Sequence, residues 1–437
     1  MIDTKRHERA LSQLGRALET DPDDPKALYE RGIALRFLDR RDESLADLDR
    51  SLELKPDHPG TLAARGLTHA LDGDYEDALA DLDRSIVLWP DDPDALNNRG
   101  AVLRHLNRPE EALLNFNRSL ELRRDDPAVL ANRGATLLDL MRPKDALANI
   151  DRSLELRPDH DDTIRLHAEA LLATGAHDDA VSAYSTYIRK HPEDADGLAG
   201  RGLAFATIDE NSQALADLNR SLELQTDDPG VLNNRGVVLL ALGRAEDALA
   251  DFISAQPLEP ASNEIVFNKG LALEHLGRTK EAYAIFNQAL DLAPNNALLL
   301  NRRGVALAKL ERYEEAIADF SHSLQVNPGD VEATHNRGIV CGHLKRYQEA
   351  LTDFGHVLQT VPGDPEAMYN RACILARMDQ PAVALEQLKE VIEKDPSYRA
   401  FALNDTDFNS VRNDDLLGPS FQELVGTPES SDDASSS

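Results

Sequence analysis

The chain has 437 residues, with 78 acidic and 47 basic side chains and a formal net charge of −31. A surface this acidic repels nucleic acid phosphates and anionic lipids, so we expect neither as a partner. No run approaches 18 apolar residues and no apolar signal segment follows Met1, so we expect no membrane insertion and a cytoplasmic protein.

The first 24 residues have the pattern of one amphipathic helix. Ala10, Leu11, Leu14 and Leu18 recur at helical spacing, and Pro22 ends the run. These residues match the second half of the repeat that follows. We therefore expect residues 1–24 to be a half-repeat that caps the N-terminal end.

From residue 25 to residue 398, one 34-residue segment occurs eleven times in succession without insertion or deletion. With Pro25 as position 1, position 8 is glycine in nine repeats. Position 20 is small in all eleven: Ser44, Ala78, Ala112, Ala146, Ala180, Ala214, Ala248, Ala282, Ala316, Ala350 and Ala384. A fixed period of this length indicates a solenoid, in which each unit buries its apolar face against its neighbours.

Each repeat has the pattern of two helices joined by a short turn. Positions 3–14 and 18–30 have helical periodicity, turn-forming residues fill positions 15–17, and proline ends nine repeats at position 32. Aspartates such as Asp92 and Asp228 then stand where they can cap the next helix. Pro257 lies within the second helix of the seventh repeat and predicts a frayed or kinked end there.

The glycine at position 8, alanine at 20, bulky residue at 24 and proline at 32 resemble the tetratricopeptide repeat family. The resemblance implies an all-α, right-handed superhelical solenoid of about eleven 34-residue helix–turn–helix repeats. It also implies a concave groove lined by positions 2, 5, 6, 9, 12 and 13 of the first helices. Such a protein is expected to be a non-catalytic scaffold or adaptor that binds a peptide or a segment of a partner protein.

After the repeats, residues 399–426 keep enough apolar content for a C-terminal capping helix, which would cover the stacking face of the last repeat. Residues 427–437 are rich in Ser and Asp, so we expect a disordered tail. Ser430 and Ser431 precede acidic residues and are candidate phosphorylation sites.

Arginine at position 7 and aspartate at position 23 occur together. A turn near position 16 places the two residues level on antiparallel helices, which favours a structural clamp over a ligand site. Six repeats carry both residues: Arg31 with Asp47, Arg65 with Asp81, Arg201 with Asp217, Arg235 with Asp251, Arg303 with Asp319, and Arg337 with Asp353.

Asparagines recur at positions 5 and 6 of the first helices, although asparagine is a poor helix former. Family members use asparagine at such positions to bind the backbone of an extended peptide, because an amide both donates and accepts. Inheritance from one duplicated unit explains the repetition equally well, so both interpretations stay open. Position 6 holds Asn98, Asn132, Asn234, Asn268, Asn336 and Asn370, and position 5 holds Asn97, Asn233 and Asn301.

Basic residues on the expected groove, among them Arg104, Arg302 and Lys309, suit a polar peptide, although they can equally form a solvated charged face. Histidine and cysteine spacings match no metal site, and no catalytic motif or cofactor-binding loop occurs. We therefore expect no enzyme activity, metal or cofactor. A self-assembling homo-oligomeric scaffold and a regulatory subunit of an enzyme complex are the alternative functions.

Overall fold

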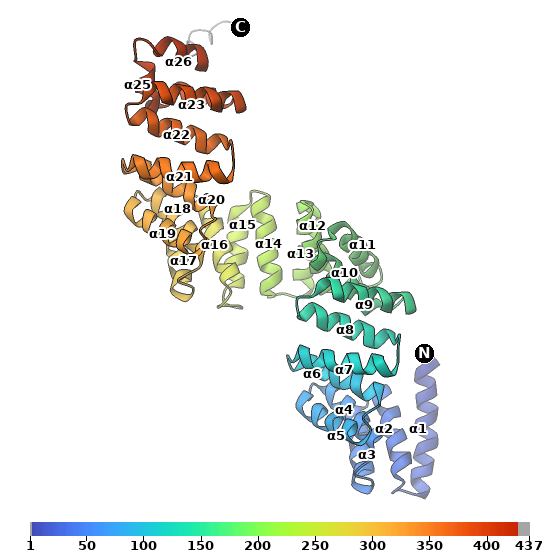
Figure 1. Ribbon diagram of the computed structural model, residues 1–437. Helices are drawn as coiled ribbons and strands as arrows, with labels where there is room; N and C mark the ends of the chain where they lie inside the picture. The colour runs from blue at the N-terminus through green and yellow to red at the C-terminus, as the bar shows by residue number, and fades with distance from the viewer. Residues whose placement is uncertain (1, 427–437) are drawn as a thin grey trace, which may run out of the picture. The chain divides into compact units, whose positions relative to one another are not determined.

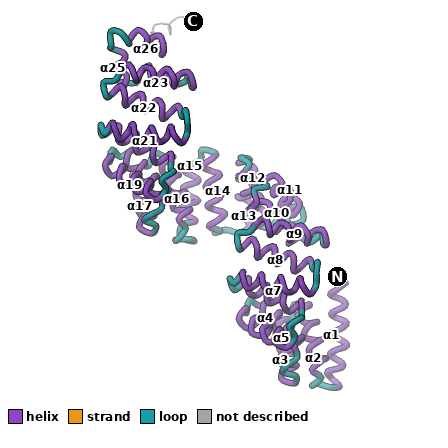
Figure 2. Tube along the Cα trace, in the orientation of Figure 1, coloured by secondary structure: helices purple, strands orange, loops and turns teal. Residues whose placement is uncertain are grey.

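The protein is described by a computed structural model that covers residues 2–426. The expected tail at 427–437, with Ser430 and Ser431, lies outside this range. Every regular element within it is a helix (Figures 1 and 2). The chain divides into two compact units, residues 1–226 and residues 227–437.

The first unit contains the N-terminal helix and six helix pairs, coloured blue to green in Figure 1. Each pair is one 34-residue repeat. The helices of the first unit are α1 (Ile2–Thr20), α2 (Pro25–Phe37), α3 (Arg41–Leu54), α4 (Pro59–Asp72), α5 (Tyr75–Leu88), α6 (Pro93–His105), α7 (Pro109–Leu122), α8 (Pro127–Asp139), α9 (Pro143–Leu156), α10 (Asp161–Thr174), α11 (His177–Ile188), α12 (Ala195–Thr207) and α13 (Asn211–Leu224).

The second unit contains five further pairs and the C-terminal segment, coloured yellow-green to red in Figure 1. Its paired helices are α14 (Pro229–Ala241), α15 (Ala245–Ala255), α16 (Asn263–His275), α17 (Thr279–Leu292), α18 (Ala297–Lys309), α19 (Tyr313–Val326), α20 (Val331–His343), α21 (Tyr347–Thr360), α22 (Pro365–Arg377) and α23 (Pro381–Lys394). Helix α15 ends two residues before Pro257, as that proline predicts.

Small residues let the two helices of each repeat approach closely. The position-8 glycines face the bulky residue at position 24 of the same repeat, and a β-carbon on Gly100 would lie 2.6 Å from the Phe116 ring. The facing position-20 residues, such as Ala112 and Ala282, are fully buried. The core therefore runs along the helix pairs as a series of similar layers and has no single centre.

The turn between the paired helices has one conformation throughout. Position 15 has a positive φ in all eleven repeats, although only Gly73, Gly175, Gly243 and Gly277 are glycines there. Residues such as Met141 and Lys345 adopt the left-handed conformation at φ 56° and 60°. The tight turn thus requires this geometry even where the side chain disfavours it.

The expected C-terminal capping helix at 399–426 is divided into short pieces. These are α24 (Tyr398–Asn404), the 3-10 helix η1 (Thr406–Phe408), α25 (Asn409–Arg412) and α26 (Gly418–Val425). The Asp405 side chain accepts a hydrogen bond from the Asp407 N–H, and the Asp414 side chain accepts from the N–H groups of Leu416 and Leu417. Each aspartate therefore starts a new turn. Phe408 and Phe421 nevertheless bury completely against the last repeat.

Candidate functional site

The six arginine–aspartate pairs lie face to face between the two helices of their repeats. In each pair the arginine Nε and a terminal nitrogen donate to the two carboxylate oxygens at 2.6–2.9 Å. The aspartates are buried and the arginines about a quarter exposed. The hydrogen bond to Asp353, for example, raises the pKa of Arg337. Both oxygens of each carboxylate therefore accept from the guanidinium of the same repeat.

The position-7 arginines also reach back to the preceding repeat, which the sequence analysis did not anticipate. Arg65 donates to Asp49 at 2.6 Å, and Arg303 donates to Asn287 at 2.8 Å, in both cases 16 residues earlier. The signal was available, because position 25, which supplies this acceptor, is mostly Asp, Asn or Ser. One arginine therefore joins two helices of its own repeat to a helix of its neighbour.

Most of the position-5 and position-6 asparagines hydrogen-bond to one another. The position-6 side chain of one repeat meets the position-5 side chain of the repeat before it, 35 residues earlier. We call these contacts inter-repeat asparagine pairs. They are Asn132 with Asn97 at 3.0 Å, Asn268 with Asn233 at 2.9 Å, and Asn336 with Asn301 at 3.3 Å, and His335 takes the position-5 place opposite Asn370 at 3.0 Å.

Two asparagines of the set have no such partner. Among residues 2–426, the side chains of Asn98 and Asn234 make no hydrogen bond, and both are half-buried. For Asn98, the residue 35 positions earlier is Ala63, which offers no acceptor. These two amides are therefore free to meet a ligand, whereas the paired ones are occupied.

The predicted basic residues differ in their surroundings. Arg104 forms a two-pronged ion pair with Asp139 of the next repeat, at 2.5 and 3.3 Å. Arg302 pairs with Glu332 at 3.3 Å through one terminal nitrogen. Lys309 is exposed and makes no ion pair among residues 2–426.

The fifth repeat interrupts the asparagine pairs with a different polar group. Tyr184 replaces the usual Phe or Leu at position 24, and a β-carbon on Gly200 would lie 2.4 Å from its hydroxyl oxygen. Glycine at that point lets the ring extend toward the first helices. Burial raises the pKa of Tyr184, and the nearby Glu169 carboxylate, itself bonded to Arg165, raises it further.

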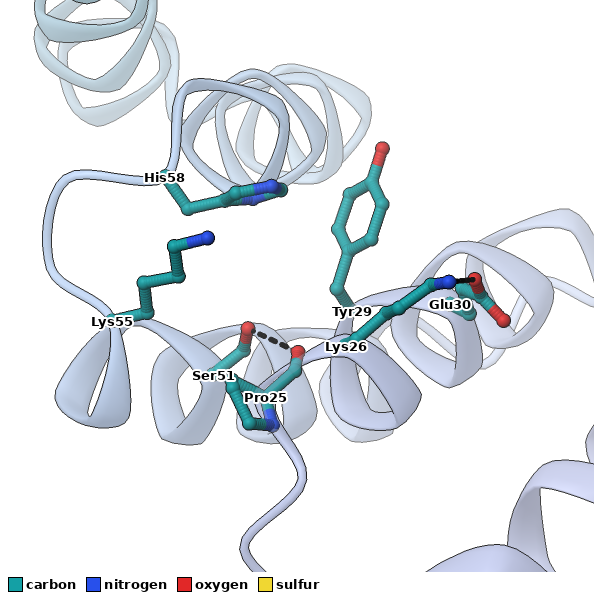
Figure 3. A pocket seen from close by; sticks show the side chains of 7 residues that line it. All are labelled: Pro25, Lys26, Tyr29, Glu30, Ser51, Lys55 and His58. Atoms are coloured by element: carbon teal, nitrogen blue, oxygen red, sulfur yellow. Dashed lines mark hydrogen bonds and ion pairs between the residues drawn. The ribbon is translucent and has the colours of Figure 1, made fainter.

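A pocket of about 200 Å³ lies at the N-terminal end of the repeats, beside Tyr29, Lys55 and His58 (Figure 3). The rings of Tyr29 and His58 meet edge to face at 5.3 Å. His58 Nδ1 accepts from the Thr61 N–H and so caps α4, a role that aspartate has in most repeats. The Nδ1 atom of His58 therefore stabilises the N-terminus of α4.

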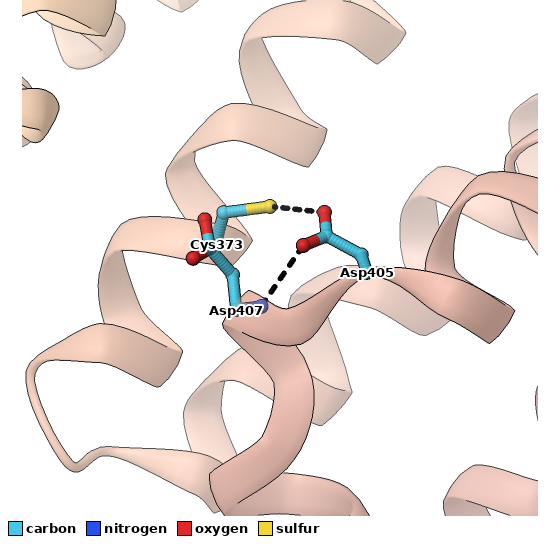
Figure 4. Close-up of side chains that lie close together, drawn as sticks. All are labelled: Cys373, Asp405 and Asp407. Carbon is cyan, nitrogen blue, oxygen red and sulfur yellow. Dashed lines mark hydrogen bonds between the residues drawn. The ribbon is translucent and has the colours of Figure 1, made fainter.

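Cys373, Asp405 and Asp407 gather where the C-terminal segment meets the last repeat (Figure 4). Asp405 accepts from the Tyr369 hydroxyl at 2.8 Å, from the Cys373 thiol at 3.6 Å and from the Asp407 N–H at 2.9 Å. Burial raises the pKa of the Cys373 thiol, which favours its protonated form. These bonds tie the C-terminal segment to α22.

Within residues 2–426, no helix is long and apolar enough to cross a membrane. Family models described as tetratricopeptide repeat match residues 3–59, 61–125, 132–195, 165–230, 233–297, 297–330 and 366–398. The chain belongs to the tetratricopeptide repeat family. Proteins of this family are in general non-catalytic scaffolds that bind other proteins.

The chain is also similar to several solved structures. The crystal structure of the APC/C heterotetramer Cut9–Hcn1 superposes with a TM-score of 0.52 at 14% identity, over 97% of this chain and 94% of that chain. Yeast Tom70 gives a TM-score of 0.42 at 14% identity, over 91% and 99%. A tetratricopeptide repeat protein from Parabacteroides merdae gives 0.45 at 20% identity, over 57% and 98%. No match to a curated protein was found.

Proposed function

We propose that this tetratricopeptide protein is a non-catalytic adaptor that binds an extended segment of a partner protein along its first helices. The observation that carries the proposal is the division among the asparagines. Asn98 and Asn234 keep their amide donors and acceptors free at position 6, while the asparagines at the other position-6 sites are paired within the chain.

The charge of the first-helix face supports a polar peptide partner. Acidic and basic side chains alternate there, as in the Arg104–Asp139 and Arg302–Glu332 pairs, in a chain that is otherwise strongly acidic. An extended segment offers backbone N–H and C=O groups that a free amide can bind simultaneously. The arginine–aspartate clamps are proposed to hold the helices that present these groups.

The test is affinity capture from a lysate of the source cell, with wild type and the double variant Asn98→Ala/Asn234→Ala. We expect the variant to retain the specific partner about tenfold less, because each lost hydrogen bond contributes roughly 0.5–1.5 kcal/mol. The matched variant Asn132→Ala/Asn336→Ala removes paired asparagines. It is expected to lower the melting temperature and to retain more of the partner than the first variant does.

Equal capture by wild type and Asn98→Ala/Asn234→Ala, with both folded by circular dichroism, would contradict the proposal. Light scattering over a concentration series then addresses self-assembly. A mass that rises to dimer or beyond would favour the homo-oligomeric scaffold instead.

A further inference from the structure

The first repeat lacks a contact that joins most of the other clamp repeats to their neighbours. In four of the six repeats with the arginine–aspartate clamp, the arginine Nη1 donates to the position-25 side chain of the preceding repeat. The acceptors are Asp49 for Arg65 at 2.6 Å, Asn287 for Arg303 at 2.8 Å, and Ser185 for Arg201 and Ser321 for Arg337, both at 3.3 Å. The corresponding residue for Arg31 is Gly15 of α1, which has no side chain to accept.

A pocket of about 420 Å³ lies at this point and is lined by residues of α1, α2 and α3, among them Gly15, Arg31 and Arg40. A β-carbon on Gly15 would meet no atom within 4 Å, so the place of the missing side chain is open. Within residues 2–426, the Arg31 side chain bonds only to Asp47 and the Arg40 side chain only to Glu43, each through Nε and Nη2. The Nη1 atom of each arginine therefore has no hydrogen-bond partner in the described chain.

These two donors favour a carboxylate as the group that completes the pocket. A guanidinium has five N–H donors, and its hydrogen bonds to carboxylates are stronger than those to neutral acceptors. Asp47 and Glu43 also line the pocket and oppose an incoming anion, but each already accepts two hydrogen bonds from its own arginine. One guanidinium can hold two carboxylates in this arrangement, because Arg65 bonds to Asp81 at 2.7 Å and to Asp49 at 2.6 Å.

We propose that Arg31 and Arg40 bind the carboxylate of a ligand in this pocket, at the place that Asp49 has beside Arg65 in the next repeat. The two arginine side chains are 29% and 45% exposed, so a ligand can reach them from solvent. An Asp or Glu side chain of a partner and a small free carboxylate offer the same chemistry. The site uses other residues than Asn98 and Asn234, so it is a binding point in addition to the one proposed above.

The test has two arms, one for each source of the carboxylate. In the first, immobilised full-length protein is offered peptide libraries whose central residue is fixed as Asp, Glu, Asn, Gln or Ala, with degenerate flanks. The Asp and Glu libraries are expected to be retained about tenfold more than the Asn and Gln libraries, because a charged acceptor strengthens the hydrogen bond. A chain with a net charge of −31 otherwise disfavours acidic peptides, so the preference identifies a local cationic site.

The second arm measures the melting temperature in sodium succinate and in sodium chloride at equal ionic strength. A small carboxylate that binds the folded protein raises the melting temperature in succinate.

Two substitutions of Gly15 make the result specific. Gly15→Asp supplies the missing acceptor from the chain itself, as Asp49 does for Arg65, and should abolish the response in both arms. Gly15→Ala is the matched control and should respond as wild type, because its β-carbon meets no atom within 4 Å and offers Arg31 no acceptor. If Gly15→Asp does not fold, Arg40→Gln at an exposed side chain should weaken the response instead.

The outcomes decide the proposal and separate it from the adaptor proposal. A response that is lost in Gly15→Asp and kept in Gly15→Ala would support the carboxylate site, and the arm that responds identifies the source. No response of wild type in either arm, or an equal response of the two glycine variants, would overturn it. Asn98→Ala/Asn234→Ala should respond as wild type, so this site can stand if the asparagine contacts fail.

Discussion

Replacement of Asp353 by alanine is expected to lower the free energy of unfolding by about 3 kcal/mol, the lower end of the effect of breaking a buried ion pair. Asp353 is 2% exposed and accepts two hydrogen bonds from Arg337, at 2.6 and 2.9 Å. Without it the guanidinium keeps its charge between two packed helices. The effect lies at the lower end because 27% of the Arg337 side chain is exposed. Urea denaturation followed by circular dichroism measures the change.

Glu349→Ala is the matched control for this experiment. Glu349 lies on the same helix, α21, and forms an equally short two-pronged pair with Arg346, but in solvent. Exposed pairs contribute little, so its removal should change the free energy of unfolding far less than the removal of Asp353 does. Equal effects of the two substitutions would refute the clamp as a stabilising contact.

Gly270→Ala is expected to destabilise the protein, although alanine is the better helix former. The substitution gains up to about 1 kcal/mol of helix propensity. However, the new β-carbon would lie 2.2 Å from the Phe286 ring, and overpacking of this kind costs about 1–3 kcal/mol. The clash is with a fully buried ring packed on all sides, so we expect the net change in unfolding free energy to be unfavourable.

Two further substitutions test this cause. Gly355→Ala lies within helix α21, where an added β-carbon meets nothing within 4 Å, and it should stabilise by about 0.5–1 kcal/mol. Phe286→Leu should partly rescue Gly270→Ala, because Ala372 and Leu388 already occupy the same two positions of the last repeat. Thermal melts of wild type, Gly270→Ala, Gly355→Ala and the double variant Gly270→Ala/Phe286→Leu measure the direction of each change. A higher melting temperature for Gly270→Ala would show that the Phe286 ring can move aside.

The period and the small residues sufficed to predict the helix pairs, because the same glycine, alanine and bulky residue must meet in every repeat. The arginine–aspartate geometry also followed from the sequence, since a turn near position 16 sets residues 7 and 23 level. The asparagine pairs did not, because a contact between positions 5 and 6 depends on how far one first helix is displaced along the next. Hydrophobic periodicity does not record that displacement.

The C-terminal segment shows a second limit of the sequence pattern. Its apolar residues indicated a cap, and Phe408 and Phe421 do cover the last repeat. The division into short helices comes from Asp405 and Asp414, whose side chains bind nearby backbone N–H groups in competition with a continuous helix. Which aspartate side chains interrupt a helix in this way can be recognised only once the backbone geometry is known.

The double contact of the position-7 arginines has a consequence for how the protein loses its structure. A residue that bonds to its own repeat and to the preceding one couples the two, so that neighbouring repeats unfold together. This coupling is missing at the last repeat, where the corresponding positions hold Gln387 and Gly355 and Arg371 makes no side-chain hydrogen bond within the described residues. The C-terminal segment packs against this last repeat. Its loss would let unfolding begin at the C-terminal end while the earlier repeats still unfolded cooperatively.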